Sequence, residues 1–226
     1  MKILTYSNQI KDILNNAEKY HSAYYQAEKF GGPSLYFHRR SLEARKTEKF
    51  ETFLEYIYAT LPSWGMHRMG GGPKMQSFNI FLESVMTVKK LIIEAETIDF
   101  RKVKNSDWFL LEKIFRNINV MESRASLVGN SKVMAHLLPN IVPPIDREHT
   151  LKYLRGNTNI KNDLDYEWKL MHEIIGTFFI PIAGDMTFLR KANTWINDQL
   201  SFPWDTSILK VIDNLVVGII ELTAKH

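Results

Sequence analysis

Polar residues suited to binding and catalysis are concentrated between Leu127 and His149, in the segment LVGNSKVMAHLLPNIVPPIDREH. The pattern predicts a tight polar turn over residues 129–131, followed by a short apolar helix from Lys132 to Leu138. A turn that leads directly into a helix presents unpaired backbone N–H groups, and these bind phosphate well. The candidate phosphate-binding residues are therefore Gly129, Asn130, Ser131 and Lys132, with Lys132 as the added cation.

A carboxylate follows this helix. The stiff extended run Pro143-Pro144-Ile145 delivers Asp146 and Arg147 to the start of another helix. This geometry could aim the Asp146 carboxylate into a cleft beside the turn, where it would act as a general base or stabilise a developing cation. The same residue types fit simple helix capping, with Asp146 as the N-cap of the following helix and Ser131 as the cap of the preceding one. The sequence leaves both interpretations open.

The order of these features resembles the helix-hairpin-helix DNA glycosylase superfamily. Its members hold a DNA phosphate with an L-P-G-x-G hairpin and a short helix, and a catalytic aspartate opens a later helix. On this chain, residues 127–131 match the hairpin and Asp146 matches the aspartate. The resemblance implies an all-α fold, DNA as the partner and base excision as the activity. Asp146 would then stabilise an oxocarbenium-like sugar, and Trp64 would stack on a base.

The chain departs from the family pattern at three positions. Val128 stands where the hairpin usually has proline, and Ser131 stands where it has its second glycine. Val133 occupies the position of the Schiff-base lysine found in bifunctional members, so the match does not extend to a lyase role. The resemblance covers only residues 127–149.

A second candidate site is the loop from Ser63 to Lys74, SWGMHRMGGGPK. It lacks the GxxxxGK[ST] spacing of a P-loop and follows a predicted helix rather than a strand, which argues against Walker-type nucleotide binding. Its aromatic and basic side chains could instead stack on bases and contact phosphates. The alternative is a connecting loop whose tryptophan fills the core. The candidate residues are Trp64, His67, Arg68 and Lys74.

A basic strip is a third candidate for phosphate binding. It would combine His38, Arg39, Arg40, Arg45, Lys46 and Lys49. However, Glu43 stands at helix spacing from Arg39 and Lys46, and Glu48 from Arg45. A solvated helix face with ion pairs is therefore the favoured interpretation.

Metal ligation has little support. His136 and His149 flank Asp146 without an HExxH spacing, and His172-Glu173 has no second histidine at the required distance. We predict no metal and no cofactor. The chain has no cysteine, which excludes disulfides, iron–sulfur clusters, thiolate zinc sites and a cysteine nucleophile.

We expect helices throughout the chain, because in no stretch do apolar and polar residues alternate convincingly with period two, as they would in a strand. We expect one all-α unit over residues 1–226, with two lobes as the alternative. Besides the Lys132–Leu138 helix, the predicted helices are Asn8–Phe30, one within Ser41–Thr60, Ser77–Glu96, Ser106–Asn117 with Ser106 as cap, Arg147–Leu154, Asp163–Phe179, Asp185–Gln199 and Asp205–Ala224.

Charge and hydropathy limit the partners. The formal net charge is +4 and the isoelectric point about 9.1, which permits a polyanionic partner without requiring one. The N-terminal segment returns to polar residues too soon for a secretory signal, and the apolar run Leu215–Ile220 is too short to span a bilayer. We therefore expect a cytoplasmic protein without membrane association.

Two functions follow from these features. The first is a DNA-binding protein similar to helix-hairpin-helix glycosylases, with Asp146 as the catalytic group. The second is a non-catalytic helical interaction module or a binder of an anionic metabolite, in which Asp146 is only a cap. Replacement of Asp146 by asparagine distinguishes them, because asparagine also caps helices well.

Overall fold

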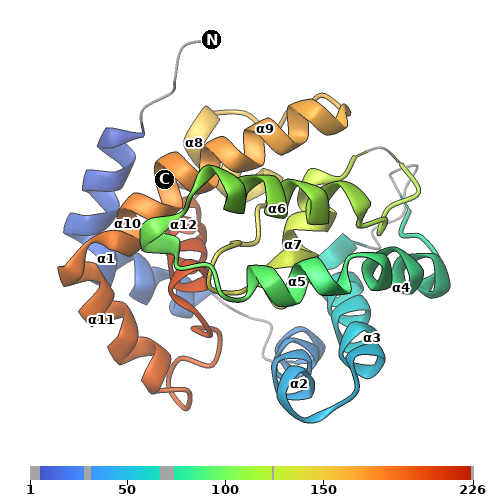
Figure 1. Cartoon of the computed structure of the whole chain (residues 1–226). Coiled ribbons are helices and arrows are strands. Elements are labelled where there is room, and N and C mark those ends of the chain that lie inside the picture. The colour runs from blue at the N-terminus through green and yellow to red at the C-terminus, as the bar shows by residue number, and fades with distance from the viewer. Residues whose placement is uncertain (1–5, 28–31, 67–73, 124, 225–226) are drawn as a thin grey trace. The chain divides into compact units, whose positions relative to one another are not determined.

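Every regular element in the part of the chain that the structure describes is a helix (Figure 1). The computed structural model describes residues 6–27, 32–66, 74–123 and 125–224. Within these residues, extended backbone pairs at one isolated antiparallel bridge between Met75 and Met121. The all-α prediction is therefore confirmed.

The helices follow one another with short connections. They are α1 (Ser7–Ala27), α2 (Pro33–Thr47), α3 (Phe50–Leu61), η1 (Pro62–Met66), α4 (Phe78–Thr87), α5 (Lys89–Ala95), η2 (Phe100–Lys102), α6 (Asn105–Asn117), α7 (Leu127–Leu137), η3 (Arg147–Leu151), α8 (Lys152–Arg155), α9 (Leu164–Ile174), η4 (Ile175–Phe179), α10 (Ile180–Gly184), α11 (Met186–Asn197) and α12 (Ile208–Thr223).

Two helices expected to be continuous are divided. The segment Ser41–Thr60 holds parts of α2 and α3, which separate where Glu48 and Lys49 adopt extended backbone angles. The segment Ser77–Glu96 holds α4 and α5, which separate at Val88. Neither break carries a glycine or a proline, so the usual breaking signals are absent.

Two helices begin at residues other than those predicted. Ser106 lies inside α6, whose N-cap is Lys104; the Asp107 carboxylate accepts a hydrogen bond from the Lys104 N–H at 2.8 Å. Helix α12 begins after Ser207, whose Oγ accepts from the backbone N–H of Lys210. Asp205, expected at the start of that helix, is instead fully buried.

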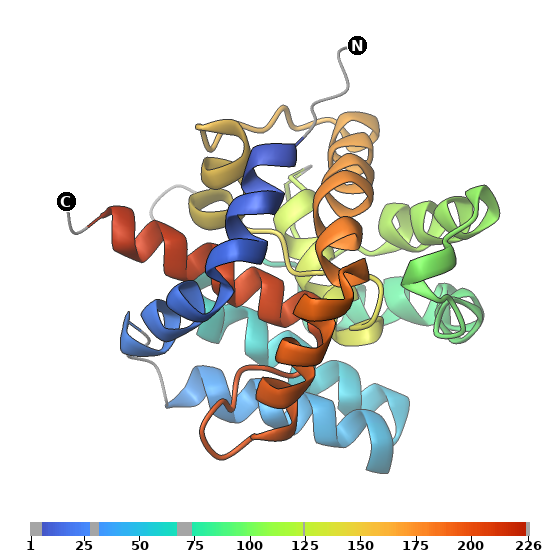
Figure 2. The ribbon, with the colours of Figure 1, turned by 90° about the vertical axis from the view of Figure 1, so that its left-hand side faces the viewer.

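The helices form two compact units, each built from segments that are distant in the sequence. Unit 1 comprises Met1–Lys29, Ile145–Asn159 and Leu170–His226, and unit 2 comprises Phe30–Pro144 and Ile160–Lys169. In unit 1 the principal packing is between α1 and α12, which cross in Figure 2. Gly218 of α12 lies against the backbone of α1, and a Cβ added there would be 2.1 Å from the Tyr20 carbonyl oxygen.

In unit 2, α2 packs along α3, and α7 contacts both α3 and α6. Helix α7 is buried around most of its circumference rather than along one stripe. A helix of this kind belongs to the interior of a protein. No helix of the described residues is long and apolar enough to cross a membrane.

Candidate functional site

The predicted turn at residues 129–131 is wrong, because α7 already begins at Leu127. Gly129 has a helical conformation, and the positive φ angles of described glycines occur at Gly65 and Gly156. Gly129 instead allows close packing: an added Cβ would be 2.7 Å from Cγ1 of Val120 and 3.1 Å from Cγ of Met121. Glycine is needed here for its size rather than for a turn.

The first N–H groups of α7 bond to a carboxylate from unit 2 itself. Oε2 of Glu167 accepts hydrogen bonds from the backbone N–H groups of Ser126 and Leu127, both at 2.6 Å. Glu167 is completely buried. Carboxylates, like phosphates, are favoured at helix N-termini by the unpaired N–H groups and the helix dipole. An internal anion thus occupies part of the position where a DNA phosphate was expected.

The polar residues after Gly129 serve the interior of unit 2. Nδ2 of Asn130 donates to the carbonyl oxygens of Phe115 at 2.8 Å and Ile118 at 3.0 Å, which satisfies acceptors at the end of α6. Oγ of Ser131 donates to the carbonyl oxygen of Val128 inside α7, so Ser131 is not the cap of this helix. Contact between the Gly129–Lys132 segment and DNA remains a prediction.

A cluster of one tryptophan, two histidines and one lysine lies within unit 2. Nδ1 of His38 and Nε2 of His136 are 3.1 Å apart, and Nδ1 of His136 lies 2.8 Å from the carbonyl oxygen of Lys132. The Trp64 ring centroid is 5.4 Å from that of His38 and 5.1 Å from that of His136. Nζ of Lys132 lies 6.0 Å from the centroid of the Trp64 ring. We call these four residues the His–Trp cluster.

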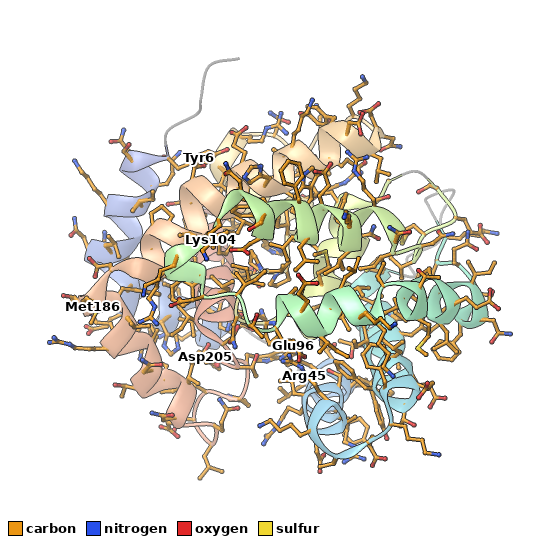
Figure 3. The ribbon with its side chains drawn as sticks, in the orientation of Figure 1. Tyr6, Arg45, Glu96, Lys104, Met186 and Asp205 are labelled. Atoms are coloured by element: carbon orange, nitrogen blue, oxygen red, sulfur yellow. The ribbon has the colours of Figure 1, made fainter. Side chains whose placement is uncertain are left out.

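The ion-paired, solvated face that was favoured over a phosphate-binding strip does carry ion pairs, but with other partners than the spacing predicted. His38 is buried, with 4% of its surface exposed, so it does not belong to a solvated face. Arg40 pairs with Glu43, and Arg45 pairs with Glu96 at 2.7 Å. Figure 3 labels Arg45 and Glu96. The predicted pairing of Arg45 with Glu48 is replaced by an ion pair with Glu96, the C-cap residue of α5, which sequence spacing on one helix could not show.

The candidate loop from Ser63 to Lys74 is described only at its ends. His67, Arg68 and residues 70–72 lie outside the described residues. Trp64 is half-buried in η1. Lys74 is exposed, and its carbonyl oxygen accepts a hydrogen bond from the N–H of Glu122 at 2.8 Å.

Asp146 opens η3 as the N-cap, so the capping geometry expected from the sequence is confirmed. Its Oδ1 accepts a hydrogen bond from the Glu148 N–H at 2.8 Å and lies 3.2 Å from Nδ1 of His149. The Asp146 N–H donates to Oγ1 of Thr150 at 3.3 Å. The side chains of Asp146 and His149 remain 28% and 31% exposed, and Arg147 is also half-exposed. This carboxylate is oriented by neighbours and accessible to solvent.

The candidate residues divide between the two units. Gly129–Lys132, Trp64 and Lys74 belong to unit 2, whereas Asp146 and Arg147 belong to unit 1. Among the described residues, no group of three or more histidine and acidic side chains is arranged to hold a metal ion.

No protein-family model, curated protein or solved structure matches this chain.

Sequence reasoning missed the histidine pair. His38 stands before two arginines, and this context pointed to a surface strip. A signal was nevertheless present, because the buried positions of α2 recur at helical spacing. These positions are Ser34, His38, Ser41 and Ala44. Their side chains are small or polar, so a search for an apolar stripe passes over them.

Proposed function

We propose that this protein binds DNA and excises a base, with Asp146 as the catalytic carboxylate, as the resemblance to helix-hairpin-helix glycosylases implies. The observation that carries the proposal is the arrangement of Asp146. Its carboxylate is fixed by the Glu148 N–H and lies beside His149, yet its side chain remains 28% exposed. A helix cap requires only the hydrogen bond from the Glu148 N–H. A catalytic carboxylate also requires access to a substrate.

The proposed reaction breaks the N-glycosidic bond between the sugar carbon C1′ and the base nitrogen. The base leaves with the bonding electron pair and takes up a proton from solvent. The Asp146 carboxylate stabilises the positive charge that develops on the sugar. Water then adds to C1′, and its proton passes to the carboxylate and onward to solvent. Arg147, which is half-exposed beside Asp146, supplies a cation for a neighbouring phosphate.

DNA binding is the first requirement of this proposal. Labelled single- and double-stranded DNA should bind the protein at low salt, and the logarithm of the binding constant should fall linearly with the logarithm of salt concentration. The absence of binding at low salt would remove the nucleic-acid function altogether.

Asp146→Asn tests the catalytic role. Because asparagine is also a good N-cap, the variant should lose less than about 1 kcal/mol of unfolding free energy. Base release should fall by about 100-fold or more, the usual contribution of a general acid–base group, while DNA affinity stays unchanged. Single-turnover base release from a panel of damaged and mismatched duplexes measures this effect.

Asp185→Asn provides a matched control. Asp185 caps α11 by accepting from the N–H groups of Thr187 and Phe188, at 3.0 and 2.8 Å. It shares the capping role of Asp146 and should leave base release unaffected. Equal effects of the two variants, or a wild-type protein that releases no base from any duplex, would exclude the catalytic role. The protein would then be a non-catalytic interaction module or an anionic-metabolite binder, with Asp146 as a cap.

A further inference from the structure

The protonation of the His–Trp cluster follows from its contacts. The carbonyl oxygen of Lys132 can only accept a hydrogen bond, so Nδ1 of His136 must carry the proton in their 2.8 Å contact. Nε2 of a neutral His136 is then a lone-pair acceptor. The 3.1 Å contact with His38 therefore requires that Nδ1 of His38 carry its proton and donate.

This arrangement accommodates one additional proton. The two neutral rings together carry two N–H groups and two nitrogen lone pairs. After one proton is added, three N–H groups and one lone pair remain. That lone pair can still accept the N–H···N hydrogen bond between His38 and His136. A second added proton places an N–H against an N–H and breaks the bond. The two rings are also 4% and 1% exposed, so water cannot easily replace the lost contact. The pair therefore distinguishes one added proton from two.

The charged groups on the helices of the pair can be named for the described residues. Lys132 lies on α7, and α2 carries the exposed Arg39 and Lys46 together with Arg40 and Arg45, which are paired with Glu43 and Glu96. Helix α3, packed against both α2 and α7, buries no titratable side chain; its buried residues are Phe53, Leu54, Ile57, Thr60 and Leu61. The described part of η1 contributes Trp64. Lys132 is a positive charge within the cluster, with Nζ 6.0 Å from the centroid of the Trp64 ring, and it opposes further protonation of the pair.

We propose that His38 and His136 form a proton-binding site that shares at most one added proton and fastens α2 to α7 until acidification adds the second. The site lies within unit 2. It does not involve Asp146 and does not require DNA binding, although Trp64 and Lys132 of the same cluster are also candidate DNA contacts. The ligand is the proton itself.

The effect on stability has a definite sign. In the unfolded chain both histidines take up a proton below about pH 6.5. The folded pair holds no more than one, so the unfolded state binds at least one proton more. Stability therefore rises with pH and falls on acidification through the histidine range. A difference of one proton changes the folding equilibrium constant about tenfold per pH unit.

His38→Asn tests the site with little change in shape. The asparagine amide can donate to Nε2 of a neutral His136 or rotate and present its oxygen to a protonated one. The folded and unfolded states of the variant then bind the same number of protons at this site. Denaturant titrations of the protein between pH 5 and pH 7 measure the folding equilibrium constant of each variant. On acidification, the constant of the wild type should fall about tenfold per pH unit relative to that of His38→Asn. His172→Asn, at an exposed position, should behave as the wild type.

A second measurement decides the matter if His38→Asn does not fold. Long-range ¹⁵N–¹H spectra of the wild type report which ring nitrogen carries each proton. At neutral pH, both His38 and His136 should be the Nδ1–H tautomer. An Nε2–H tautomer of His136 would overturn the proposal. So would a native spectrum in which both rings are doubly protonated, or equal pH dependence of the wild type and His38→Asn.

Discussion

Gly218→Ala is expected to lower the unfolding free energy by about 3 kcal/mol or more, at or beyond the upper end of usual over-packing costs. The added Cβ would lie 2.1 Å from the Tyr20 carbonyl oxygen and 3.0 Å from the Tyr24 nitrogen. These are backbone atoms, so no side-chain rotation relieves the overlap. Helices α1 and α12 would have to separate, and their contact is the most extensive between helices of unit 1. Chemical denaturation monitored by circular dichroism measures the loss.

Gly184→Ala is the matched control in the same unit. Gly184 ends α10, and beyond its chain neighbours and the adjacent helix backbone no heavy atom lies within 4 Å of the position where its Cβ would be added. The substitution should change stability by no more than about 0.5 kcal/mol, as at ordinary surface positions. Equal denaturation midpoints for the two variants would show that α1 and α12 do not approach as closely as described.

Asp205→Ala should cost several kcal/mol, about 1–3 kcal/mol for each of the two buried donors that lose their acceptor. Asp205 is fully buried, and its carboxylate lies 2.6 Å from Nε2 of His21 and accepts from Nδ2 of Asn214 at 2.7 Å. The His21 ring stacks on Trp195 at 3.9 Å. Removal of the carboxylate leaves the imidazole and the amide without their acceptor in a dry interior. Figure 3 labels Asp205.

Two comparisons isolate this contribution. Asp165→Ala removes an ion pair with Arg116 whose carboxylate side chain is 67% exposed, so it should cost less than about 1 kcal/mol. A double-mutant cycle between His21→Ala and Asp205→Ala should return a coupling of more than about 1 kcal/mol, because the two side chains are in contact. A coupling near zero would refute a direct interaction.

The Asp205 carboxylate also influences a neighbouring phenol. Burial raises the pKa of Tyr25 well above its usual range, and the negative charge of Asp205 raises it further. Tyr25 is therefore protonated at neutral pH. Its oxygen accepts a hydrogen bond from the backbone N–H of Trp204 at 3.2 Å.

The sequence predicts those helices whose buried face is apolar and whose cap is a standard residue. Helix α11 shows this best, because the predicted Asp185–Gln199 helix matches α11, and Asp185, the first predicted residue, is its N-cap. The breaks at Glu48–Lys49 and Val88 were missed because no glycine or proline marks them. They separate helices that pack on each other, and tertiary packing overrides the local pattern there.

The candidate site was predictable to a similar degree. The position of Asp146 as a cap follows from the stiff proline run before it. The turn at Gly129 was wrong because glycine has two uses, and spacing alone cannot separate a positive φ angle from close packing against Val120. The carboxylate of Glu167 reaches the start of α7 from 40 residues away, which no local pattern indicates.

The pairing of α1 with α12 has a consequence for biosynthesis. A ribosome delivers α1 early and α12 late, and His21 precedes Asp205 by 184 residues. At usual elongation rates of about 5–20 residues per second, His21 waits roughly 10–40 s for that partner. During this interval the apolar face of α1, including Tyr20 and Tyr24, lacks the helix that buries it. We therefore expect the nascent chain to expose this face until α12 emerges from the ribosome.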